Sequence, residues 1–168
     1  MTSSPVAPDS TMEIIGRAVE LGRSGDVAAA RIGLLDVWQQ IGASGDPFHR
    51  CTLAHYLADL CDHPAEALIW DTRALDAAAS ITDDRAQQHH HSLQVAGFYP
   101  SLFLNIADNL RRLEAFDSAL EHITQAEERC GALPDDGYGE TIRTAIREVH
   151  RSIDDRDSAR RESAPGAS

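Results

Sequence analysis

Apolar residues recur along this chain at the three- to four-residue spacing of amphipathic helices, and breaks rich in Gly, Pro and Asp separate the apolar stretches. The spacing is clearest in the segment that starts at Pro100, whose apolar stripe comprises Leu102, Phe103, Ile106, Leu110 and Leu113. The pattern predicts an all-α protein with helices over residues 11–23, 27–41, 47–60, 64–79, 100–112, 116–129 and 140–153.

Residues at the predicted helix starts support these bounds. Ser10 and Glu13 have the spacing of a capping box at the start of the first helix. Asp26 can cap the second helix and Asp46 the third, where Pro47 occupies a first helical position that tolerates proline.

Three segments repeat one short pattern, in which an apolar helix is followed by a turn and by a small residue just inside the next helix. The small residues are Ala30, Ala67 and Ala119. Two antiparallel helices joined by a tight turn can approach closely only where the crossing residue is small. Self-similar helix–turn–helix units predict a stacked array of helix pairs.

The spacing of the three units is uneven. Ala67 follows Ala30 by 37 positions, close to a repeat of about 34 residues, whereas Ala119 follows Ala67 by 52 positions. The excess lies in residues 81–99, which either form an inserted helix or extend the next helix backwards with a kink at Pro100.

These features resemble tetratricopeptide repeats (TPRs), whose unit carries a turn glycine, a small residue and a second small residue seven positions later. The matching residues are Gly25, Ala30 and Val37 in the first unit, Ala67 and Ala74 in the second, and Ala119 and Ala126 in the third, with Asp62 and Glu114 in place of the later glycines. The chain is also similar to small single-domain actinobacterial members of this class. The resemblance implies a TPR-like α-solenoid of about three helix pairs with one inserted helix and a C-terminal capping helix.

The expected organisation is one helical repeat domain between two disordered ends. Residues 1–9 are rich in Ser and Pro, and residues 155–168 are rich in Asp, Arg and Ser, as is typical of disordered segments. The domain spans 10–154, and its parts are the repeats 11–42, 47–80 and 100–131, the insertion 81–99 and the cap 138–154.

Charge and composition narrow the classes of partner and compartment. The formal net charge is −12, and all 15 basic residues are arginine, as is typical of a high-GC genome. An acidic surface repels a phosphate backbone, so neither nucleic acid nor a membrane is expected as partner, and another protein or peptide, including a basic one, is favoured. Three cysteines without a CxxC pair, no signal peptide and no long apolar run predict a cytoplasmic location.

The family resemblance also implies a concave groove lined by the first helix of each pair. The groove residues expected to contact a peptide or helix of a partner protein are Tyr56, Asp59, Tyr99, Asn105, Asp108 and Arg112. Asp108 and Arg112 also have the i,i+4 spacing of an ordinary surface ion pair, so a solvated face is the competing interpretation. A carboxylate clamp is not favoured, because the chain has no lysine and only Asn105 and the adjacent arginines remain for that role.

A small-molecule or metal site, with enzymatic activity as its extension, is the alternative function. Its residues are His55, His90 and His91, placed where the insertion meets the groove. Three consecutive histidines fan over about 200° on a helix and cannot share one ion. No Gly-rich phosphate loop, GxSxG or HExxH motif occurs. We therefore expect no catalytic residues, metal or cofactor, and we expect a protein–protein interaction module; self-association through the first unit is a third alternative.

Overall fold

A computed structural model describes residues 9–90 and 93–162 of the chain, and its regular structure within these ranges is entirely helical. The α-helices are α1 (Ser10–Arg23), α2 (Val27–Ile41), α3 (Pro47–Asp59), α4 (Pro64–Ala78), α5 (Asp83–His89), α6 (Tyr99–Arg112), α7 (Phe116–Glu128) and α8 (Gly137–Asp154). Two short 3-10 turns, η1 (Val95–Gly97) and η2 (Cys130–Ala132), complete the list. The prediction of an all-α protein is confirmed for these residues. None of the helices in the described part of the chain is both long and apolar enough to cross a membrane.

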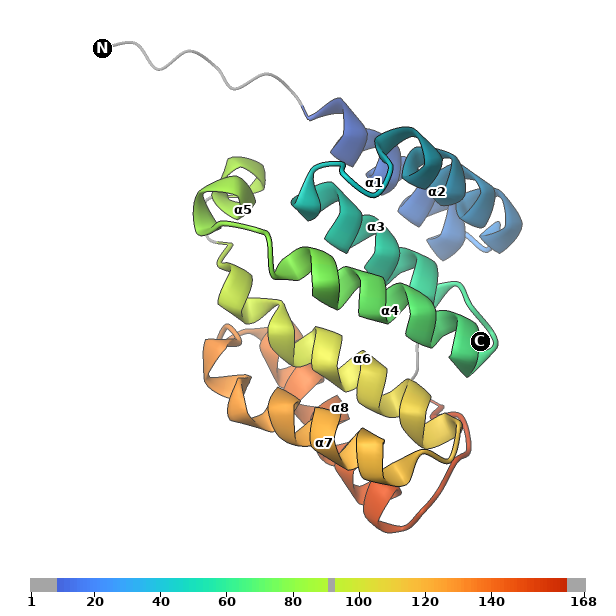
Figure 1. The fold of residues 1–168 in the computed structure, drawn as a ribbon, viewed down its shortest axis with the longest axis vertical. Helices are drawn as coiled ribbons and strands as arrows, with labels where there is room; N and C mark the ends of the chain where they lie inside the picture. Colours follow the sequence, from blue (N-terminus) through green and yellow to red (C-terminus); the bar gives the residue numbers. More distant parts are fainter. Residues whose placement is uncertain (1–8, 91–92, 163–168) are drawn as a thin grey trace.

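The helices form three hairpins that follow one another in chain order. Figure 1 shows α1 paired with α2, α3 with α4, and α6 with α7, while α8 packs against both α6 and α7. Ala30, Ala67 and Ala119 are buried at the hairpin crossings, as expected from their size. One apolar core lies among α1 to α4 and the start of α6, and a second lies among α6, α7 and α8.

Helix caps agree with the sequence at two of the three predicted starts. Asp26 accepts a hydrogen bond from the Ala29 backbone N–H at 3.1 Å, and Asp46 accepts one from Phe48 at 3.0 Å. The predicted capping role of Ser10 is wrong, because α1 already includes that residue and Asp9 is the cap. A carboxylate is as good an acceptor of the backbone hydrogen bond as a serine hydroxyl. Its negative charge is also stabilised by the positive end of the helix dipole.

The insertion between the second and third hairpins contains a separate helix, α5, rather than a backward extension of α6. Thr82 caps α5, and the Asp83 carboxylate accepts a hydrogen bond from the Val95 backbone N–H at 2.9 Å. Ala86 anchors the helix in the core. The last helix, α8, begins at Gly137, three residues before its predicted start, because Asp136 caps it.

The segment after α8 differs from its expected disorder as far as the structure describes it. Arg156 has a φ of 51°, and the chain reverses there. Residues 157–161 then lie against α6, where the buried Arg111 guanidinium donates hydrogen bonds to the carbonyl oxygens of Asp157 and Ala159. Composition indicated a solvated tail because a contact between Arg111 and main-chain oxygens leaves no signal in a sequence.

Candidate binding groove

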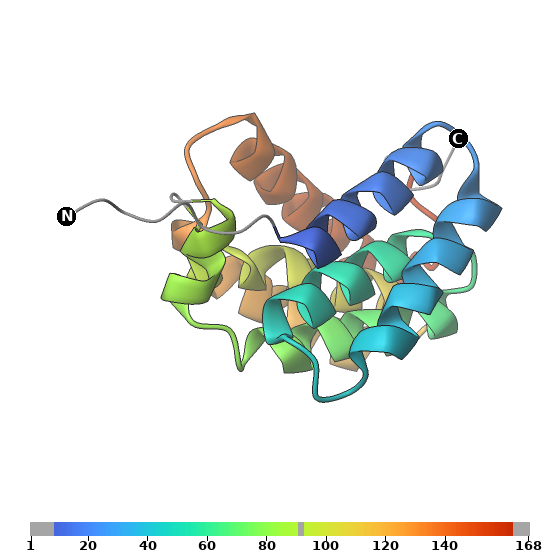
Figure 2. The ribbon, with the colours of Figure 1, turned by 90° about the horizontal axis from the view of Figure 1, so that it is seen from above.

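A hollow of about 450 Å³ lies on the concave face of the molecule. Figure 2 shows α1 and α8 standing on the same side of α3 and α6, so that these four helices surround the concave face. The walls of the hollow are mostly apolar and aromatic, and they include Ile15, Val19, Tyr56, Leu93, Phe98 and Tyr138. His55 on α3 and His89 on α5 add polar atoms to the wall.

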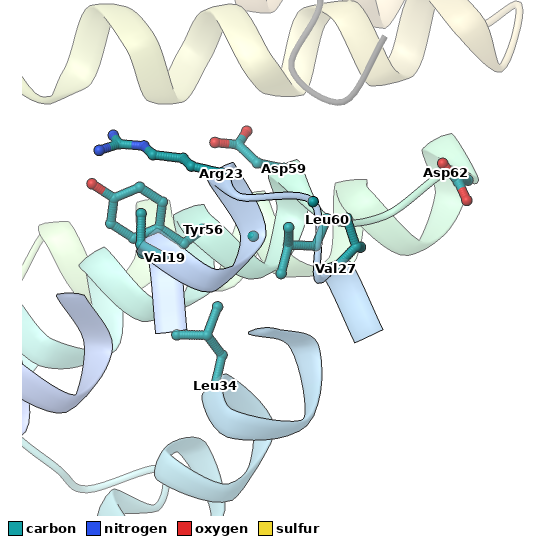
Figure 3. Close-up of a pocket in the computed structure, with 10 residues that line it drawn as sticks. Val19, Arg23, Val27, Leu34, Tyr56, Asp59, Leu60 and Asp62 are labelled. Carbon is teal, nitrogen blue, oxygen red and sulfur yellow. The ribbon is translucent and has the colours of Figure 1, made fainter. Parts of the chain in front are cut away.

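A second hollow of about 490 Å³ continues the first toward the turns between the helices. The two hollows share Val19, Arg23 and Tyr56, so they form one groove along α1 and α3. Figure 3 shows the Tyr56 ring beside Val19, with the Arg23 and Asp59 side chains on the same side of the second hollow. The groove therefore combines an apolar floor with charged groups at one end.

The charged end contains a buried carboxylate, that of Asp71. Only 1% of the surface of this residue is exposed to solvent. Asp71 projects from α4, and the side-chain amide of Asn109 on α6 donates a 2.8 Å hydrogen bond to it. The Asn105 amide nitrogen lies 3.4 Å from both the Asp71 carboxylate and His55 Nδ1. Asp59 on α3 completes this cluster, which therefore joins three helices.

Burial governs the electrostatics of the cluster. It raises the pKa of Asp71 well above the ordinary carboxyl value, and the charge of Asp59 adds to the rise, while hydrogen bonds from Asn105 and Asn109 oppose it. Burial also raises the pKa of Asp59, an effect that the charge of His55 opposes. Removal from water is thus the main cause of the raised pKa at both carboxyl groups, because burial disfavours the charged form.

A third, small hollow of about 50 Å³ lies next to this cluster and is lined by four of the predicted site residues, Asp59, Asn105, Asp108 and Arg112. The expected ion pair between Asp108 and Arg112 is not the one that forms. Asp108 instead pairs with Arg111 at 2.8 Å and with Arg161 at 3.6 Å. Arg112 donates a 3.1 Å hydrogen bond to the Asp62 carbonyl oxygen in the turn between α3 and α4.

Five of the six predicted groove residues border this connected region, and one does not. Tyr56 lines both large hollows, and Asp59 lines the second large hollow and the small one. Tyr99 lines none of the three; it borders a different hollow beside α7 and stacks on Phe103 with ring centroids 6.1 Å apart. Tyr99 therefore lies outside this groove, on the part of α6 that faces the end of α7.

Two histidines of the alternative site, His55 and His90, lie within the described residues, and they do not line the same hollow. His55 lines the groove, whereas His90 is an exposed residue at the end of α5 and His91 lies outside the described residues. His89 is the histidine of the insertion that faces the groove, where its ring lies 5.3 Å from that of Phe48. Within residues 9–90 and 93–162, no group of three or more His, Cys, Asp or Glu side chains is arranged to hold a metal ion.

Sequence reasoning missed Asp71 and Asn109, although each carries a detectable signal. Asp71 interrupts the buried stripe of α4 between Ala67 and Ala74, and Asn109 and Arg111 interrupt the buried faces of α6. A polar residue within an apolar stripe is unusual and predicts a buried polar contact.

Comparison of the chain with protein-family models, with curated proteins and with solved structures found no match. The resemblance to TPRs consequently stays a prediction, and functional inference depends on the groove.

Proposed function

We propose that this protein is a TPR-like α-solenoid that acts as an interaction module and binds a peptide or helix of another protein in its concave groove. The observation that carries the proposal is the continuity of the two large hollows through Val19, Arg23 and Tyr56. A groove that extends along two helices suits an elongated ligand, such as a helix or an extended segment, better than a compact molecule.

The chemistry of the lining also supports a protein ligand. Tyrosine combines a large apolar ring with a polar hydroxyl, and it is enriched among the residues that contribute most to protein–protein affinity. Tyr56 is half-buried at the junction of the hollows, where a partner side chain would contact its ring. Arg23 and Asp59 add charges of both signs at one end and can orient a bound segment.

Site-specific photocrosslinking tests this proposal. A photoreactive phenylalanine analogue replaces Tyr56 in one sample and Ile69, an α4 residue that is 53% exposed and lines none of the hollows, in the control. We expect one partner to be crosslinked from position 56 and not from position 69. Tyr56→Ala should weaken binding of that partner by about ten-fold or more, with unchanged helical circular dichroism. Equal crosslinking from both positions, or affinity unaffected by Tyr56→Ala, would contradict the proposal.

A small-molecule ligand is the alternative, and the volume of the first hollow is the observation that favours it. Its value of about 450 Å³ lies within the range of roughly 300–1,000 Å³ that is usual for ligand pockets. In that case, a fraction of cell extract below about 1 kDa should raise the melting temperature of the wild type but not of His55→Ala. Crosslinking from position 56 would then give no protein product, because the groove would bind a small molecule.

A further inference from the structure

The segment that follows α8 occupies the charged end of the groove as a bound peptide would. We call residues 157–161 the strap. Arg111, which is fully buried, donates hydrogen bonds to the main-chain oxygens of Asp157 and Ala159, the second at 2.8 Å. These oxygens belong to residues two positions apart, so one guanidinium group binds the main chain of the strap at two points. The strap is thus held partly through its backbone, a form of recognition that is independent of side chains.

Two adjacent arginines supply the side-chain contacts of the strap. Arg160 Nη1 lies 3.7 Å from the Asp62 carboxylate, in the turn between α3 and α4. Arg161 Nε lies 3.6 Å from the Asp108 carboxylate on α6, and its Nη1 lies 3.2 Å from Glu148 on α8. Three acidic residues from three parts of the fold therefore surround one pair of arginines.

The strap covers a space that the rest of the chain leaves open. The small hollow of about 50 Å³ is bordered by Arg160 and Arg161 on one side and by Asp59, Asp71 and Asn105 on the other. Asp59 also lines the second large hollow, so the charged end is continuous with the groove. The strap therefore lies at the end of the surface that the proposed function assigns to a partner.

We propose that the charged end of the groove recognises an extended peptide with two adjacent arginines in a partner protein, and that the strap is its intramolecular occupant. This inference rests on the proposed function and specifies its ligand. A tethered segment acts at an effective concentration in the millimolar range, so a partner peptide must displace the strap before it binds. The chain's own sequence, Asp157-Ser158-Ala159-Arg160-Arg161, indicates the chemistry of that peptide.

A peptide-binding experiment on the full chain tests the proposal. The double variant Arg160→Glu, Arg161→Glu places negative charges against Asp62, Asp108 and Glu148 and should expel the strap. The probe is a fluorescein-labelled peptide of residues 154–162, DDRDSARRE, and its anisotropy reports binding. We expect the double variant to bind the probe at least ten-fold more tightly than the wild type, and we expect added salt to weaken binding. Replacement of Arg160 and Arg161 in the probe by alanine should abolish binding, and this control leaves the protein unchanged.

Protein controls locate the site on the groove. Adding Asp108→Asn to the double variant should lower probe affinity by about ten-fold, whereas Glu121→Gln, which removes one exposed charge from α7, should not change it. Equal probe affinity of wild type and double variant, absent binding in both, or binding that does not need the probe arginines would overturn the proposal. So would a wild-type dimer that dissociates in the double variant, because the occupant would then be the strap of a second copy. Crosslinking from position 56 is independent of these results, so failure of this proposal and failure of the proposed function are distinguishable.

Discussion

Replacing Asp71 by asparagine should stabilise this protein at neutral pH, and the effect should depend on pH. The carboxylate is 1% exposed, and the groups that face it are Asn105 and Asn109 on α6 and His55 and Asp59 on α3, while Asp108 on α6 adds a further negative charge. Asparagine retains an oxygen that can accept the 2.8 Å hydrogen bond from Asn109 and carries no charge to desolvate. The substitution therefore removes a buried charge while preserving the shape of the contact.

The magnitude follows from the raised pKa of Asp71. A carboxyl whose folded-state pKa exceeds its unfolded value stabilises the fold fully below the unfolded pKa, near 4, and loses that contribution as pH rises through the folded pKa. Each pKa unit between the folded and unfolded states of Asp71 lowers the stability of the charged folded state by about 1.4 kcal/mol. At pH 7 this cost cannot exceed about 4 kcal/mol, because only about three units separate pH 7 from the unfolded-state pKa. Since the pKa of Asp71 is raised well above its ordinary value, we expect Asp71→Asn to be more stable than the wild type at pH 7, by an amount below this ceiling of about 4 kcal/mol.

Urea unfolding at a series of pH values measures this effect. The difference in free energy of unfolding between variant and wild type should be largest at pH 7, where the variant should also have the higher melting temperature, and it should vanish near pH 3. Acidic groups distant from Asp71 titrate equally in both proteins and cancel in the difference, whereas Asp59 and Asp108 interact with Asp71 and their response is part of the measured difference. A variant less stable at pH 7, or a difference that is constant from pH 3 to 7, would refute the argument that burial of the charge is costly.

Three further substitutions test other features of the fold. Glu114→Gly should raise stability by about 1 kcal/mol in thermal unfolding, because Glu114 has a φ of 62°, a conformation that costs side-chain-bearing residues about that amount. Between pH 4 and pH 2, the free energy of unfolding of Asp9→Asn should fall by about 1 kcal/mol less than that of the wild type, as measured by urea titration. This magnitude is reduced for solvent screening. Burial raises the pKa of Asp9, but hydrogen bonds, of which that with His49 is the strongest, outweigh burial and lower the pKa to about 2. The stability that the Asp9 carboxylate contributes is therefore present above pH 4 and is lost as the pH falls toward 2. Gly139→Ala should destabilise by about 2 kcal/mol or more, as measured in urea, because a Cβ atom would clash with the Pro134 carbonyl oxygen.

Glu114→Gly and Gly139→Ala each have a matched control. Gly25→Ala should destabilise by about 1 kcal/mol, because Gly25 occupies the corresponding turn of the first hairpin with a φ of 100°. Gly137→Ala should be close to neutral, because a Cβ atom there meets nothing within 4 Å. Destabilisation by Glu114→Gly, an unchanged acid profile in Asp9→Asn, or equal effects of Gly137→Ala and Gly139→Ala would contradict the respective arguments.

The sequence by itself determined the number of hairpins and the residues at their crossings. Helical spacing and caps such as Asp26 are local, since they involve residues within one or two turns of the same helix. The small residues Ala30, Ala67 and Ala119 could be identified because close packing demands small size at one position of each unit. The same logic placed Tyr56 and Asp59 on the groove, since a repeating unit presents corresponding helix faces to the same side.

Tertiary structure alone decided the composition of the charged end of the groove. Asp71 meets Asn109 from a different hairpin, and Arg111 holds the strap through main-chain oxygens, which every residue possesses and no sequence pattern marks. The direction of the strap likewise depends on one backbone angle, at Arg156. Contacts between distant residues depend on how the helices are stacked, and that arrangement arises only when the apolar faces of all the hairpins are buried together.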